Sequence, residues 1–200
     1  MAAEAMAAGF RPAQSALGPR MIGSSRARPA LPEVFQQVME AVYACLTLHE
    51  SYWLAREGAD AVPCFGALSG PIETGPRPDV EAMAEAFTRD VAALHPVLQP
   101  ILGERTLAGV TAVAASPTSL VYDDDLWAAT VFEFLVAYHR AVITREHVAQ
   151  MLLPLYLGRT ASFLMEHASS GPATFDAAFE SLCLAFERAK PPAAALWKKA

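Results

Sequence analysis

Four basic side chains lie close together in the sequence, on both sides of a short break between two apolar segments. They are His139, Arg140, Arg145 and His147. Arginine can hold a carboxylate or phosphate through two parallel hydrogen bonds, and histidine can change its charge near neutral pH. The group is therefore a candidate anion-binding site. The alternative is structural: cations at the end of a predicted helix interact favourably with its free carbonyl groups, and Glu146 is available to pair with them.

A fifth candidate ligand-binding residue, Arg159, lies one turn after Leu155 and one turn before Phe163, on or beside the apolar face of its segment. A buried arginine needs an acidic partner. The interior of the preceding apolar segment contains a single acid, Glu133. We therefore expect an internal ion pair between Glu133 and Arg159 that fixes two helices against each other.

Three aspartates in a row, at residues 123–125, have a spacing that can hold a divalent ion against a diphosphate. They directly precede a predicted helix, however. Carboxylates at a helix N-terminus accept hydrogen bonds from free N–H groups and oppose the helix dipole. We therefore predict that these aspartates cap the helix and that the chain has no metal site.

The remaining candidates point to structure rather than chemistry. His49 lies between Leu46 and Trp53 on an apolar face, which is typical of a hydrogen-bonded core histidine. The chain contains no phosphate-loop, dinucleotide-binding or nucleophile-elbow motif. We therefore predict no cofactor and no catalytic residue.

Helical spacing of apolar residues defines the elements that must position these side chains. It predicts helices at roughly 32–56, 79–96, 125–142, from 144 onward with a kink at Pro154, and at 172–190. The segment 97–120 is ambiguous and favours one or two short helices. No segment alternates with a period of two, so no sheet is expected. The fold class is therefore all-α, a bundle of about five to seven amphipathic helices.

Two segments fall outside this helical pattern. Residues 62–78 are rich in proline and glycine and are predicted to form one long ordered loop. Residues 1–30 hold four arginines against a single glutamate and are predicted to be a flexible Ala/Arg-rich extension; an organellar transit peptide has a similar composition. The helical domain is expected to span residues 31–200.

Composition excludes several functions. The 200 residues carry a net charge of −6, which argues against nucleic acid as a partner. No apolar run approaches the ~18 residues of a membrane-spanning helix, so no membrane association is expected. Three isolated cysteines indicate a reducing, cytoplasmic setting. Because 54% of the residues are apolar, we expect more apolar surface than one bundle can bury, and hence a partner domain or a homodimer.

Several strings in the second half of the chain carry a resemblance to a known family. They are residues 126–134 (LWAATVFEF), 138–140 (YHR), 145–147 (REH) and 154–163 (PLYLGRTASF), with 182–187 (LCLAFE) also in keeping. This region resembles the C-terminal helical part of bacterial glucosylglycerate and mannosylglycerate synthase-like glycosyltransferases. The resemblance implies a helical region that packs against an N-terminal α/β nucleotide-sugar domain and contributes dimer contacts. The family's donor site and metal-binding residues have no counterpart here, so no catalytic residue is carried over.

Two hypotheses follow. In the first, the chain is a glycosyltransferase-related helical domain that lacks the nucleotide-sugar-binding domain, is inactive alone, and packs against a separately encoded catalytic domain or forms a homodimer. In the second, it is a stand-alone helical interaction module or a small-anion-binding protein without catalysis, with His139, Arg140, Arg145, His147 and Arg159 as the candidate ligand-binding residues.

Overall fold

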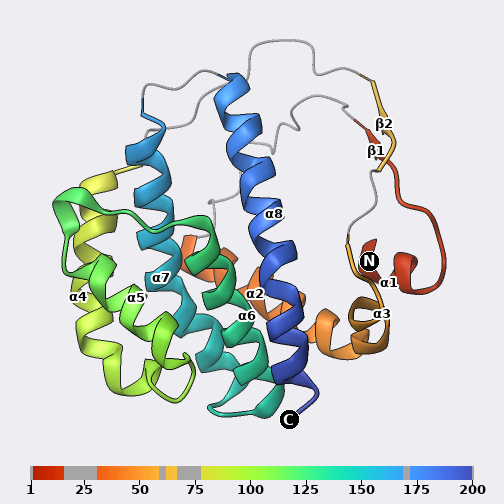
Figure 1. Cartoon of the computed structure of the whole chain (residues 1–200), viewed down its shortest axis with the longest axis horizontal. Coiled ribbons are helices and arrows are strands. Elements are labelled where there is room, and N and C mark those ends of the chain that lie inside the picture. Colours follow the sequence, from red (N-terminus) through yellow and green to blue (C-terminus); the bar gives the residue numbers. More distant parts are fainter. Residues whose placement is uncertain (1, 16–30, 59–61, 67–77, 169–171, 200) are drawn as a thin grey trace, which may run out of the picture.

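The computed structural model describes residues 2–15, 31–58, 62–66, 78–168 and 172–199, and within them the chain is almost entirely helical (Figure 1). The α-helices are α1 (Ala2–Ala7), α2 (Leu31–Leu48), α3 (Glu50–Leu54), α4 (Val80–Leu98), α5 (Glu104–Ala114), α6 (Asp124–Arg140), α7 (Arg145–Glu166) and α8 (Pro172–Trp197). A 3₁₀ turn, η1 (Pro117–Ser119), precedes α6. The predicted all-α bundle is confirmed.

Two very short strands are the exception to this helical architecture. β1 (Gln14–Ser15) pairs in parallel with β2 (Cys64–Phe65), so the expectation of no sheet fails at these four residues. Within the predicted extension, α1 and β1 give regular structure to residues 2–7 and 14–15. Most of that extension, and residues 67–77 of the predicted Pro/Gly-rich loop, lie outside the described residues.

Several helix boundaries differ from the prediction, and prolines explain most of the differences. The helix predicted to stop at Pro96 continues to Leu98, and α8 runs through Pro191 and Pro192 to Trp197. A proline inside a helix removes one backbone hydrogen bond. Pro96 cannot bond the carbonyl of Ala92, and the helix continues for only two more residues, to Leu98. The last turns of α8 are held instead by contacts with α6.

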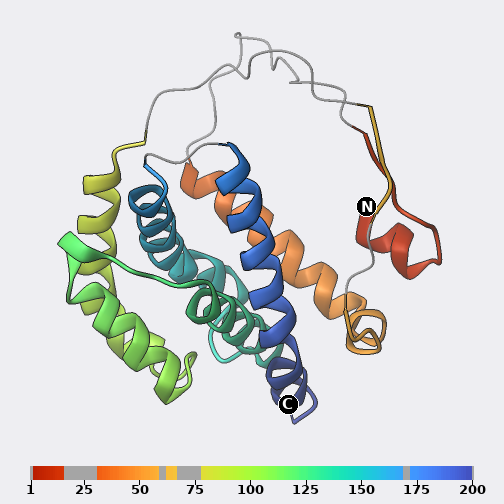
Figure 2. The same cartoon turned by 45° about the horizontal axis from the view of Figure 1, so that its top comes forward.

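Helices α6 and α7 form the centre of the bundle. Close packing joins α4 to α7 and α8 to α6, while α2 packs across α7 and α6. Figures 1 and 2 show α4 and α5 on one side of this centre and α1 and α3 on the opposite side. At one crossing a Cβ at Gly158 of α7 would overlap the ring of Phe87 on α4, so these helices approach closely.

The core is apolar and includes two fully buried tyrosines. The largest buried side chains are Tyr43, Phe87, Val91, Leu98, Tyr122, Phe134, Leu135, Leu152 and Leu155. The hydroxyl of Tyr43 donates a hydrogen bond to the carbonyl oxygen of Val131 at 3.2 Å, which fixes α2 on α6. The hydroxyls of Tyr122 and Thr130 lie 2.9 Å apart within the core. The hydroxyl groups of both buried tyrosines thereby have hydrogen-bond partners within the core.

Candidate functional site

The three aspartates at the start of α6 have three different roles. The Oδ1 atom of Asp123 accepts a hydrogen bond from the backbone N–H of Leu126 at 2.8 Å. This is the predicted N-terminal cap, and for Asp123 the prediction is confirmed. Asp124 and Asp125 instead bind side chains of other helices, so the prediction that all three cap the helix is wrong for these two.

Asp124 forms an ion pair with Arg159 of α7, whose exposed fraction is 8%. Arg159 also donates through Nη1 to the carbonyl oxygen of Tyr122 at 3.1 Å. The second carboxylate oxygen of Asp124 accepts a hydrogen bond from Ser181 Oγ of α8 at 2.7 Å. The carboxylate of Asp124 thus joins α6, α7 and α8. It also neutralises the charge of the buried Arg159, which would be costly without an acidic partner.

The predicted ion pair between Glu133 and Arg159 is therefore wrong. Asp124 and Glu133 are nine residues apart on α6, about two and a half turns, so their side chains leave the helix on opposite sides. Glu133 faces α5, where it accepts hydrogen bonds from the backbone N–H of Gly103 and from Thr106 Oγ1, both at 2.8 Å. Gly103, the N-cap residue of α5, has no side chain, and Glu133 of another helix bonds its free backbone N–H.

Burial also affects the ionisation of Glu133. Its desolvation raises the pKa of the carboxyl above the ordinary value of 4.5, and the hydrogen bonds from Gly103 and Thr106 oppose that shift. The carboxylate form of Glu133 is thus less favourable in the folded protein than in water.

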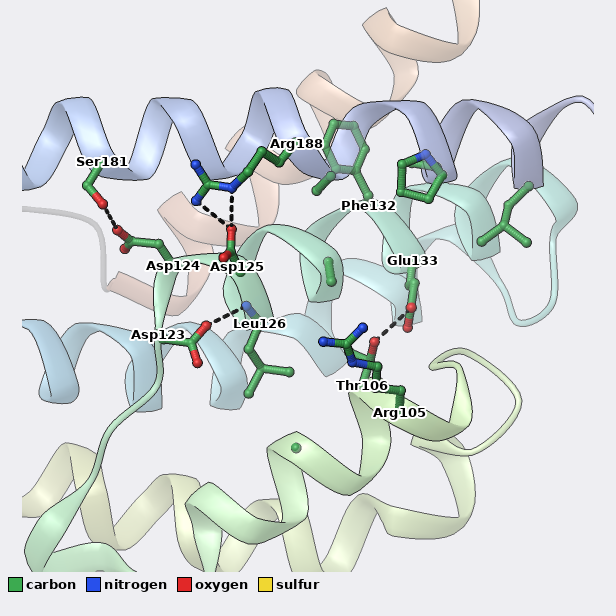
Figure 3. Close-up of a pocket in the computed structure, with 16 residues that line it drawn as sticks. Arg105, Thr106, Asp123, Asp124, Asp125, Leu126, Phe132, Glu133, Ser181 and Arg188 are labelled. Carbon is green, nitrogen blue, oxygen red and sulfur yellow. Dashed lines mark hydrogen bonds and ion pairs between the residues drawn. The ribbon is translucent and has the colours of Figure 1, made fainter.

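Asp125 lies further toward solvent and pairs with Arg188 of α8. Both Nη2 and Nε of Arg188 bond to the same oxygen, Asp125 Oδ1, at 2.6 and 3.0 Å. The two side chains are 56% and 67% exposed. Figure 3 shows this pair, Ser181 and Asp124 in a row where α8 passes over the first turn of α6.

A cleft of about 950 Å³ opens beside this row, between α5 and α8, with α6 as its floor. Leu126, Ala129 and Phe132 supply apolar floor residues, and Ala193 and Leu196 line it from α8. Arg105 of α5 lines the opposite wall. Sequence reasoning missed this cleft because its residues come from three helices, and no local pattern brings them together.

A second cleft, of about 730 Å³, lies between α7 and the first turns of α8. Asp124 and Ser181 line both clefts, and Arg159 lines the second. The hydrogen bond between Asp124 and Ser181 therefore marks the boundary between them.

The structure gives the four predicted basic residues separate partners. The ring of His139 stacks on that of Trp197 with centroids 3.7 Å apart, and Arg140 Nη2 donates to the carbonyl oxygen of Leu196 at 2.5 Å. Arg145 lies over the ring of Tyr138 at 5.1 Å, and His147 hydrogen-bonds Thr144. Anion binding by His139, Arg140, Arg145 and His147 stays a prediction.

Two smaller predictions about polar partners are corrected. Within residues 78–168 and the other described ranges, Glu146 forms no ion pair with the basic residues around it. His49 lies between α2 and α3, and its Nε2 is buried with no hydrogen-bond partner among the described residues, so the predicted hydrogen bonding of this histidine is not found at Nε2.

The outer face of α2 carries an apolar stripe that sequence reasoning assigned only in part. We define the α2 stripe as Leu31, Val34, Val38, Ala41, Cys45 and Leu48, whose spacing alternates between three and four residues. Leu31, Val38 and Leu48 are 45%, 53% and 72% exposed. Val38 and Val42 share the helical spacing of Phe35 and Met39, which is typical of a core face, yet both are exposed. The core face of α2 is instead centred on Tyr43.

Comparisons with known proteins complete the description of the site. No family model, no curated protein and no solved structure matches this chain. Among the described residues, no group of three or more metal-binding side chains is positioned to hold an ion. None of the described helices combines the length and hydrophobicity needed to cross a membrane.

Proposed function

We propose that this protein is a helical association module that pairs with another folded unit through the α2 stripe. The observation that carries the proposal is the exposure of an apolar stripe along the full length of a surface helix. The outward face of such a helix is ordinarily polar. Positions repeating every three and four residues form the contact seam of paired helices. At 1.5 Å per residue, the 18 residues of α2 give a seam of about 27 Å.

The surroundings of the α2 stripe favour a second copy of the chain as the occupant. The residues that flank the stripe are Phe35 and Val42 on one side and Gln37 and Ala44 on the other, and none is charged. Charged flanks set partner choice in paired helices, and like charges oppose self-pairing. Two copies of α2 therefore meet without repulsion, through the self-complementary patch that a two-fold dimer needs.

Residue size along the α2 stripe favours an antiparallel pair. In that arrangement Val38 packs against Ala41 of the second copy, and Val34 against its Cys45. Each of these two layers then combines one larger and one smaller side chain, and Leu31 meets Leu48 at the ends of the seam. In a parallel pair the two alanines and the two cysteines would face each other and leave the seam underfilled, which is unfavourable.

The oligomeric state tests this proposal. The full chain is expected to be a dimer by size-exclusion chromatography with light scattering, and Val38→Lys is expected to be a monomer because it places a charge in the seam. Ala92→Lys adds the same charge at an exposed position of α4, outside the α2 stripe and its flanks, and should leave the dimer intact. A monomeric parent protein, or an equal effect of the two substitutions, contradicts the proposal. Circular dichroism shows whether both variants stay helical.

Crosslinking tests the antiparallel arrangement separately. Cys64 and Cys183 are exposed and are first replaced by serine, which leaves Cys45. In this background, a short bismaleimide should crosslink the Val34→Cys variant between chains, because residue 34 of one copy faces Cys45 of the other. The protein with Cys45 alone should not be crosslinked. Crosslinking of the parent would indicate a parallel pair, with the proposed association itself still intact.

The residue strings in α6 and α7 support a second proposal. On their resemblance we propose that the chain is related to the helical region of glucosylglycerate and mannosylglycerate synthase-like glycosyltransferases, in which it packs against an α/β nucleotide-sugar domain. On this proposal the chain contributes contacts and no catalytic residue. The purified chain is then expected to transfer no sugar from a nucleotide donor to glycerate, and robust turnover by the chain alone would contradict the proposal.

A further inference from the structure

We infer that the cleft between α5 and α8 is a binding site for an amphipathic monoanion, an aliphatic carboxylate whose charged group pairs with Arg105 while its chain lies on the floor formed by α6. This site is separate from the α2 stripe and does not depend on the proposed association.

The size and lining of the cleft suit a small organic molecule. Ligand sites typically enclose about 300–1,000 Å³ and combine apolar walls with a few polar groups. The volume of about 950 Å³ lies within that range. Leu126, Phe132 and Leu196 present aliphatic and aromatic surface, and the small side chains of Ala129 and Ala193 leave room above it.

The charges in the cleft determine the class of ligand. Every acid that lines it already has a partner: Asp123 caps α6, Asp124 binds Arg159 and Ser181, and Asp125 binds Arg188. Glu133 accepts hydrogen bonds from Gly103 and Thr106.

Arg105 differs from all of these groups. It has no hydrogen-bond or ion-pair partner among the described residues, and Figure 3 shows its guanidinium group turned into the cleft. A cationic ligand would have to compete for a carboxylate that is already bonded. An anionic ligand needs only the free fork of Arg105, which can hold a carboxylate through two hydrogen bonds.

Burial of Glu133 supports the same choice. Desolvation raises the pKa of this carboxyl, so its negative charge is disfavoured where the ligand chain would lie. A nearby aliphatic chain is compatible with a carboxyl whose environment is already partly apolar.

Calorimetric titration of the full chain with octanoate, octanol and octylammonium tests the inference. Octanoate is expected to bind most tightly. Arg105→Gln should weaken octanoate binding by about tenfold, since it removes a charge-assisted contact, and should leave octanol binding unchanged. Arg89→Gln, at an exposed arginine of α4 outside the cleft, is the matched control and should change neither.

A second variant tests the apolar part of the site. Ala129→Leu fills the floor of the cleft and should weaken octanoate and octanol alike. The inference is overturned if octylammonium binds as tightly as octanoate, if Arg105→Gln binds octanoate as the parent does, or if none of the three molecules binds at millimolar concentration.

Discussion

The two ends of α6 are attached to the rest of the bundle by different physical means. At the first turn, carboxylates make the contacts: Asp124 binds Arg159 and Ser181, and Asp125 binds Arg188. At the last turn, His139 stacks on Trp197 and Arg140 bonds to a backbone carbonyl of α8. Ion pairs hold one end, and ring packing with a backbone hydrogen bond holds the other.

This difference shows how charge at a helix terminus is used when a second helix lies alongside. Helices α6 and α8 run in the same direction. Ser181, early in α8, contacts the start of α6, and Leu196, late in α8, contacts the end of α6. Acids at the start and bases at the end of α6 suit its dipole. Both sets of charged residues also bind a neighbouring helix. A charged residue in the sequence therefore indicates where a helix begins or ends more reliably than it indicates which side chain it will bind.

The largest expected effect follows from breaking the first end. Arg159→Met should lower the free energy of unfolding by about 3–5 kcal/mol, because it leaves the carboxylate of Asp124 partly buried without its cation. Urea denaturation followed by circular dichroism measures the loss. Adding Asp124→Asn removes the uncompensated charge and should recover part of the stability.

The neighbouring ion pair is the matched control for Arg159. Arg188→Met makes the same change in an exposed pair at the same turn of α6, and it should cost only about 0–1 kcal/mol. Equal losses in Arg159→Met and Arg188→Met would mean that burial does not distinguish the two pairs, contrary to this description of the first end.

A smaller loss is expected at the other end of α6. Trp197 is 3% exposed, stacks on His139, packs edge-on against Trp53 at 5.3 Å, and donates a hydrogen bond to Glu50 at 2.9 Å. Trp197→Ala should cost about 3 kcal/mol, the low end for a buried tryptophan, because the last turn of α8 can relax. Thermal or urea unfolding of the variant measures this cost.

Trp197→Phe separates ring packing from the hydrogen bond to Glu50. It keeps an aromatic ring against His139 and removes the indole N–H, so it should cost about 1 kcal/mol. If phenylalanine proves as damaging as alanine, the hydrogen bond rather than the stacked ring holds this end, and the contrast between the two ends weakens.

Much of the fold was predictable because apolar spacing reports which residues can face a core. The helical segments around Phe87, Phe134 and Leu152 were predicted from spacing alone, and the cap at Asp123 from an acidic residue directly before a helix. The ends of the helices were harder to predict. Pro191 and Pro192 indicate the end of a helix, but tertiary contacts hold α8 together beyond them.

Partners across helices were much less predictable. Spacing predicts one apolar face for α2 that includes Val38, whereas the helix buries Tyr43 and exposes Val38, and nothing local in the sequence decides between them. For Arg159, an acid near the start of α6 and one in its middle were equally possible in sequence. Only the rotation of α6 about its own axis selects Asp124, and that rotation is set by packing of the whole bundle.

The smallest expected effect concerns the middle of α6, where Glu133 attaches it to α5. Because the pKa of Glu133 is raised above its ordinary value of 4.5, the folded protein binds a proton there more readily than the unfolded chain. This contribution to stability is therefore greatest at pH values below 4.5 and is lost as the pH rises through the raised pKa. Glu133→Gln removes this pH dependence.

The two proteins are best compared by urea denaturation at a series of pH values from 4.5 upward. The parent's advantage over Glu133→Gln, about 1 kcal/mol from hydrogen bonds to Gly103 and Thr106, should shrink as the pH rises. An advantage that grows with pH would mean that the hydrogen bonds outweigh desolvation. The middle of α6 would then be held by a favoured charge, as its first turn is, and the contrast along the helix would be confined to its last turn.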